Sequence, residues 1–143
     1  MSRTFSFALL VVVIAGCRAL EREGANPLPE NAPPLTYEEM VSRARGQASA
    51  ALDAFYIDAW LDLEQAAQRL EQSARFLPKT TQIPELFQTK IDAESELLRK
   101  DAVKLIDAAR GRKAKETNEA MQRINERIRA LRPAEKQPGE SKD

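Results

Sequence analysis

The sequence predicts an all-α protein: an antiparallel three- or four-helix bundle preceded by a signal peptide and a proline-rich linker. Three observations support this. The composition favours helix, with abundant Ala, Leu, Glu, Lys and Arg and only five glycines in 143 residues. Apolar residues recur three and four positions apart over long stretches. Runs of β-branched residues with a period of two are missing downstream of the first 17 residues.

The first 16 residues have the order of a signal peptide. Arg3 precedes an apolar stretch from Phe5 to Ala15, and small residues follow it. About 12 apolar residues are too few to span a bilayer of roughly 30 Å as a helix. We therefore expect residues 1–16 to be removed.

The residues around the expected cleavage point are Ile14, Ala15, Gly16 and Cys17. This run resembles the lipobox of bacterial lipoproteins, with Ile14 in place of the commoner Leu. The resemblance implies cleavage before Cys17 and acylation of its sulfur and amino group, so that membrane lipid is the first partner. The residue after the cysteine is Arg18 and not Asp, which favours an outer-membrane anchor facing the periplasm over the inner membrane of a Gram-negative envelope.

A linker is expected over residues 17–35. It contains Pro27, Pro29, Pro33 and Pro34 and shows no helical period. In polyproline geometry, 18 residues at about 3.1 Å each would hold a domain up to roughly 50 Å from its anchor. At the other end, residues 133–143 are polar and rich in Pro and Gly, so we expect a disordered tail.

The helical domain is expected over residues 36–132, and its first helix has a complete start signal. Thr36 is the expected N-cap and Glu39 completes a capping box, so the helix should begin at Tyr37. The apolar period continues to Leu77, before Pro78. Gly46 is the weak point, so this segment is expected to be either one helix of about 40 residues or two helices that meet at Gly46.

Two further helices are expected after Pro78. Pro84 should lie in the first turn of a second helix of about 27 residues that is C-capped by Gly111. A third helix of about 17 residues should end before Pro133. It carries a stripe with a four-three alternation, formed by Thr117, Met121, Ile124, Ile128 and Leu131.

Charge is balanced overall but not along the chain. The 22 basic and 22 acidic residues cancel, which gives no general attraction to nucleic acid. Residues 36–98 hold eleven acidic and six basic residues, and residues 99–132 hold five acidic and eleven basic ones. We expect the two halves to pair as antiparallel neighbours; a basic face for anionic lipid or polymer is the alternative.

Several catalytic and cofactor chemistries are excluded by composition. Histidine is absent and Cys17 is the single cysteine. The chain therefore lacks the residues needed for Ser-His-Asp or Cys-His catalysis, for a His/Cys zinc site and for covalent attachment of haem. We therefore predict no catalytic residues, no metal and no cofactor. An enzyme that uses a carboxylate pair as acid and base would be the exception, and no such pair stands out.

Three groups of residues are candidate sites. Phe55, Tyr56 and Trp60 are either core residues or the lining of a ligand pocket. Arg123, Arg127, Arg129 and Arg132, with two preceding lysines, form a basic surface that either packs on the acidic first helix or binds a partner. Asp58 with Asp62, and Asp92 with Glu96, are either solvated acidic faces or the carboxylates of a cation site.

The last 100 residues also resemble, by pattern only, the bundles of the cytochrome c-prime type. The similar features are a turn at Gly111, then Ala120, Ile124 and Ile128, and a closing Leu131-Arg132-Pro133. In that family the last helix carries Cys-x-x-Cys-His. Here Ile124, Arg127 and Ile128 fall in those positions, so the resemblance implies a haem-free relative without the family's haem chemistry.

Together these observations lead us to expect a non-enzymatic envelope lipoprotein whose bundle binds a protein partner or itself. A ligand or metal carrier without covalent haem is the alternative.

Overall fold

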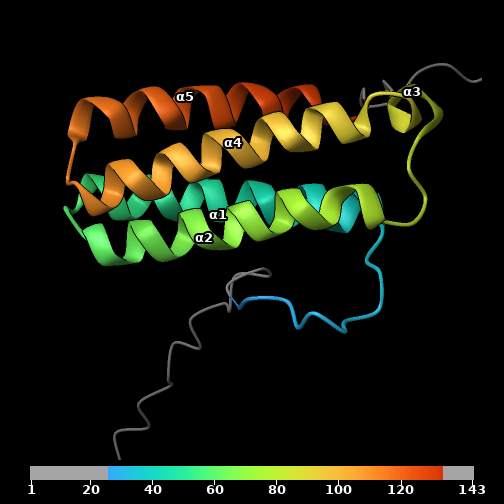
Figure 1. Cartoon of the computed structure of the whole chain (residues 1–143), viewed down its shortest axis with the longest axis horizontal. Coiled ribbons are helices and arrows are strands. Elements are labelled where there is room, and N and C mark those ends of the chain that lie inside the picture. Colours follow the sequence, from blue (N-terminus) through green and yellow to red (C-terminus); the bar gives the residue numbers. More distant parts are fainter. Residues whose placement is uncertain (1–25, 134–143) are drawn as a thin grey trace, which may run out of the picture.

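Four long antiparallel helices form the bundle in the computed structural model, which describes residues 26–133. They are α1 (Tyr37–Tyr56), α2 (Trp60–Phe76), α4 (Ile91–Arg110) and α5 (Ala114–Ala130). A 3₁₀ turn, η1 (Leu77–Lys79), and a one-turn helix, α3 (Glu85–Gln88), connect α2 to α4. Figure 1 shows that α1 packs on α2, α2 on α4 and α4 on α5, while α5 also contacts α1. The expected all-α bundle is confirmed, with four helices.

Helix α1 begins where its capping residues predict. The backbone N–H of Glu39 donates to the Thr36 hydroxyl at 3.3 Å, and the backbone N–H of Thr36 donates to the Glu39 carboxylate at 2.8 Å. These two bonds satisfy N–H groups that have no partner inside the helix. The expected start at Tyr37 is confirmed.

The first apolar stretch breaks at Asp58, and not at Gly46. Gly46 lies inside α1, whereas α1 ends at Tyr56 and α2 begins at Trp60. Asp58 has φ 56°, in the left-handed region that short polar residues tolerate better than others. The expected single 40-residue helix and the expected bend at Gly46 are both wrong. The chain reverses at Asp58, although the three-and-four spacing of apolar residues continues through this position.

The expected 27-residue second helix is also interrupted. Pro84 caps the short α3, and the chain leaves helical geometry around Lys90 before α4 begins at Ile91. The far end agrees better with expectation. Gly111 is the C-cap of α4, and the left-handed residue of that turn is the following Arg112, with φ 50°.

The core is built largely from small side chains. Eleven buried alanines lie between the helices, so the backbones approach closely, and larger residues fill the space between them. The four-three stripe of α5 is confirmed, since each of its five members is at most 5% exposed. The largest buried side chain is Tyr37, whose ring stacks on Phe87 with 5.3 Å between centroids.

Residues 26–35 lie along the surface of the bundle. We call this segment the strap. The isobutyl groups of Leu28 and Leu35 pack against the core, and Thr81 exchanges backbone hydrogen bonds with Leu35 and Tyr37, at 2.9 and 2.8 Å. The described part of the expected linker, residues 26–35, is therefore docked on the bundle, because partial burial of these two leucines removes apolar surface from solvent.

Candidate interaction surfaces

The basic helix α5 is held by one buried carboxylate. Asp101 of α4 is 2% exposed, and its two oxygens accept hydrogen bonds from Arg123 at 3.0 Å and Arg127 at 2.5 Å. Burial alone would raise the pKa of Asp101, but the hydrogen bonds and charges of Arg127 and Arg123 together outweigh it and lower the pKa below its usual range. The pair of arginines thus fastens α5 to α4.

This arrangement divides the four arginines of the expected basic surface. Arg123 and Arg127 are partly buried against Asp101, whereas Arg129 and Arg132 are exposed near the end of α5. The expected packing partner also changes, since α5 takes its counterion from α4 and not from the acidic first helix. Sequence reasoning missed Asp101 because it lies in the basic half of the chain.

The expected pairing between the two halves is nevertheless present between α2 and α4. Arg110 donates to Glu64 at 2.7 Å, and Arg99 lies 3.8 Å from Glu71. Each pair joins the acidic half to the basic half. These side chains are partly exposed, so each contributes at most about 1 kcal/mol.

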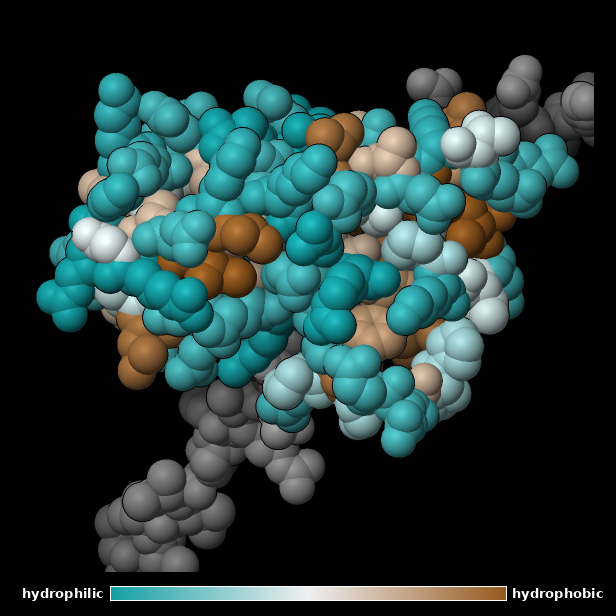
Figure 2. Space-filling view, viewed as in Figure 1, coloured by the Kyte–Doolittle hydropathy of each residue, from teal (hydrophilic) through white to brown (hydrophobic). Residues whose placement is uncertain are grey.

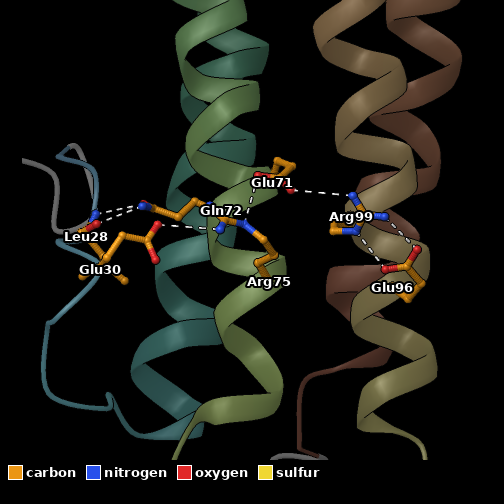
Figure 3. Close-up of polar contacts among 7 residues, drawn as sticks. All are labelled: Leu28, Glu30, Glu71, Gln72, Arg75, Glu96 and Arg99. Atoms are coloured by element: carbon orange, nitrogen blue, oxygen red, sulfur yellow. Dashed lines mark hydrogen bonds and ion pairs between the residues drawn. The ribbon is translucent and has the colours of Figure 1, made fainter.

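A chain of polar contacts connects the strap to α2 and α4 (Figure 3). The side-chain amide of Gln72 accepts from the backbone N–H of Leu28 and donates to its carbonyl, both at 2.8 Å. Glu30 lies 3.6 Å from Arg75, which also contacts Glu71 at 3.5 Å. Glu71 in turn reaches Arg99, so ion pairs run from the strap to α4.

The strap also forms one wall of a surface pocket. This pocket has a volume of about 150 Å³ and lies between Pro33, Pro34 and Leu35 on one side and Met40 and Phe76 on the other. A more open depression of about 350 Å³ lies beside Pro27 on α2. Sequence reasoning missed both, and no local pattern in the strap announces Gln72 as its partner.

The aromatic residues gather at the turn between α1 and α2. Phe55 and Trp60 are half-buried and meet edge to face with 5.8 Å between centroids, and Tyr56 is 76% exposed. None of the three lines either pocket described above. Figure 2 shows that the face in view is mostly hydrophilic, with hydrophobic residues in separate small patches.

The acidic residues do not gather around a common point. Within residues 26–133, no group of three or more Asp, Glu, His or Cys side chains is arranged to hold a metal ion. Glu96 instead accepts from Arg99 at 2.8 Å, which lowers the pKa of Glu96, and it lies 3.9 Å from Lys100. Asp58 and Asp62 are exposed at the α1–α2 turn.

The predicted lipidation site lies outside the described residues, as do Ile14, Ala15 and Gly16 and most of the tail. Among the helices of residues 26–133, none has the length and apolar character needed to cross a membrane. No family model, curated protein or solved structure matches the chain.

Proposed function

We propose that the chain is a lipid-anchored envelope protein whose bundle serves as a non-enzymatic interaction or structural module. The observation that carries the proposal is the order of the amino-terminal residues: one basic residue, an apolar stretch, and then Ile14, Ala15, Gly16 and Cys17. Two or three acyl chains on Cys17 make a durable anchor, because burial of each CH₂ contributes about 0.8 kcal/mol.

The docked strap supports the second half of the proposal. Since residues 26–35 are held on α2 by Gln72 and Arg75, only the short segment 18–25 remains between an acylated Cys17 and the bundle. Eight residues span at most about 28 Å. The bundle would then lie close to the membrane, with the side that carries the strap attached to the anchor. Such a fixed position suits an interaction or structural module.

Membrane flotation of the full chain tests the proposal. The chain is expressed with its own amino terminus in a bacterial host, and membranes are floated through a density gradient before and after a high-salt wash. We expect the wild-type chain to float under both conditions and to have the mass of residues 17–143 plus acyl chains. The Cys17→Ser variant should carry no acyl chains, whether it leaves the membrane fraction or keeps residues 1–16. A wild-type chain that washes off, or a variant that behaves identically, would contradict the lipid anchor.

A further inference from the structure

Three large apolar side chains project from the turn between α1 and α2. Tyr56 is 76% exposed, Ile57 75% and Leu61 68%, and we call these three residues the apolar tip. Only one other large apolar residue in the described part of the chain is as exposed, Leu86 at 67%, and it stands alone on α3. The tip is therefore the largest concentration of exposed apolar side chains in residues 26–133.

The backbone that carries the tip is fixed. Asp58 donates to the Phe55 carbonyl at 3.2 Å, Ala59 to that of Ala54 at 2.9 Å, and Trp60 to that of Asp58 at 3.0 Å. Beneath the turn, Phe55 and Trp60 pack against the core. The exposed side chains are thus held outward by a hydrogen-bonded turn on a packed base.

The strap leads the chain toward this end of the bundle. Traced backwards from Leu35, beside the first turn of α1, it meets Gln72 of α2 at Leu28 and Arg43 of α1 at Asn26. In Figure 1 it runs from the α3 end back along the bundle. From Arg43 to Tyr56 the remaining axial distance along α1 is about 20 Å, and the eight residues between Cys17 and Asn26 span up to about 28 Å.

We propose that the apolar tip inserts into the interface of the lipid bilayer that holds the acylated Cys17. This inference rests on the proposed lipid anchor and gives the bundle an orientation, with the α1–α2 turn at the membrane and α3 away from it. Tyr and Trp favour the boundary between headgroups and acyl chains, where one end of the ring is apolar and the other polar. Charges of both signs lie at this end of the bundle, the exposed Asp58 and Asp62 beside the tip and the exposed Arg112 and Lys113 in the α4–α5 turn, so the apolar side chains and not a net charge drive the insertion.

Trp60 makes the inference measurable without a label, since it is the only tryptophan of the chain. The lipidated full-length protein is reconstituted in phosphatidylcholine vesicles, with and without bromine atoms near the headgroup end of the acyl chains. We expect Trp60 to lose about half of its fluorescence in the brominated vesicles, because interfacial side chains reach roughly 5–10 Å into the boundary. The loss should not change between low and high salt.

Paired variants separate the tip from the anchor. The double variant Ile57→Ser with Leu61→Ser should lose the quenching and still float with the vesicles, whereas Leu86→Ser, an equally exposed leucine on α3, should quench like the wild type. All three positions are exposed, and circular dichroism checks that the helices are retained.

Two outcomes would overturn the inference. If the lipidated protein floats but Trp60 is equally bright in both kinds of vesicle, the tip does not enter the bilayer and the lipid anchor still stands; a dimer mass in that sample would assign the tip to a second copy. If the chain carries no acyl groups and does not float, the proposed function fails and this inference fails with it.

Discussion

The buried carboxylate of Asp101 joins α4 to α5 through two arginines. It is 2% exposed and is the counterion of Arg123 and Arg127, which are both partly buried. Removing one member of such a group leaves the others desolvated and unpaired, which costs more than the ion pair contributes. We therefore expect the loss of the Asp101 carboxylate to weaken the packing of α5 on α4.

We expect Asp101→Asn to lower the free energy of unfolding by about 2 kcal/mol, since Arg123 and Arg127 keep some solvent contact. Urea denaturation at pH 7 measures this, with the exposed Asp107→Asn on the same helix as the control. Because the folded-state pKa of Asp101 lies below the 3.8 of an aspartate in the unfolded chain, its contribution is present above that pH and lost as the pH falls further. Equal stability of the two variants would contradict the account.

Tyr37 gives a second prediction, at alkaline pH. Its hydroxyl donates to the Leu131 carbonyl at 2.5 Å, and burial, with a smaller contribution from Glu94, raises its pKa from 10.0 to about 12. The raised pKa means that the unfolded chain loses the proton first, so Tyr37 stabilises the fold fully below pH 10 and progressively less from pH 10 to 12. Each pH unit corresponds to about 1.4 kcal/mol.

The variant Tyr37→Phe should therefore be less stable than the wild type at pH 7, by roughly 1 kcal/mol. It should also lose stability less steeply above pH 10. Thermal unfolding at several pH values measures both effects, and Tyr56→Phe at the exposed tip is the control. A wild type and a Tyr37→Phe variant with parallel pH profiles would show that the hydroxyl is not buried.

At the scale of the elements, the positions of the helices followed from the sequence better than their boundaries did. The capping box at Thr36, the C-cap at Gly111 and the stripe of α5 are local signals, and the structure contains each of them. The breaks at Asp58 and near Lys90 carry no glycine or proline at the break itself. The chain must reverse there so that the long helices can pack side by side. The residue pattern within one segment does not show where that reversal falls.

The turn at Asp58 is a place to test this. Since its φ of 56° suits glycine, Asp58→Gly should keep or raise stability, and Asp58→Val should lower it by roughly 1–2 kcal/mol because a β-branched side chain is strained there. Urea denaturation compares the two, and the same pair of substitutions at the exposed Asp62 inside α2 should reverse the order. If Asp58→Val is as stable as Asp58→Gly, the chain does not turn at this residue.

For the whole molecule, the strap is the feature that the sequence predicted least well. Its prolines correctly indicate an extended segment, yet they say nothing about Gln72, which lies 44 residues away from Leu28. A single side-chain amide that both donates to and accepts from one backbone residue has no local sequence signature. The same holds for the candidate sites. Asp101 lies on α4 and its two arginines lie on α5, so their contact follows from the packing of the two helices and not from the residues around Asp101.

The strap can be loosened at that amide. In Gln72→Glu the carboxylate keeps the acceptor for the Leu28 N–H but loses the donor to the Leu28 carbonyl, at a cost of about 1 kcal/mol. We expect amide hydrogen exchange at Leu28 to become roughly five- to tenfold faster while the helices exchange as before. Gln122→Glu, an exposed position on α5, is the control, and unchanged exchange at Leu28 in the Gln72 variant would mean that the strap is held by its leucines alone.

Native mass spectrometry of the full chain measures whether the bundle is tied to lipid through Cys17. The protein is expressed with its own amino terminus, extracted from membranes in mild detergent and measured intact. We expect the mass of residues 17–143 plus acyl chains, and a bound protein or second copy would identify the partner of the module. A chain that begins at another residue, or that carries no acyl chains, would contradict this lipid anchor.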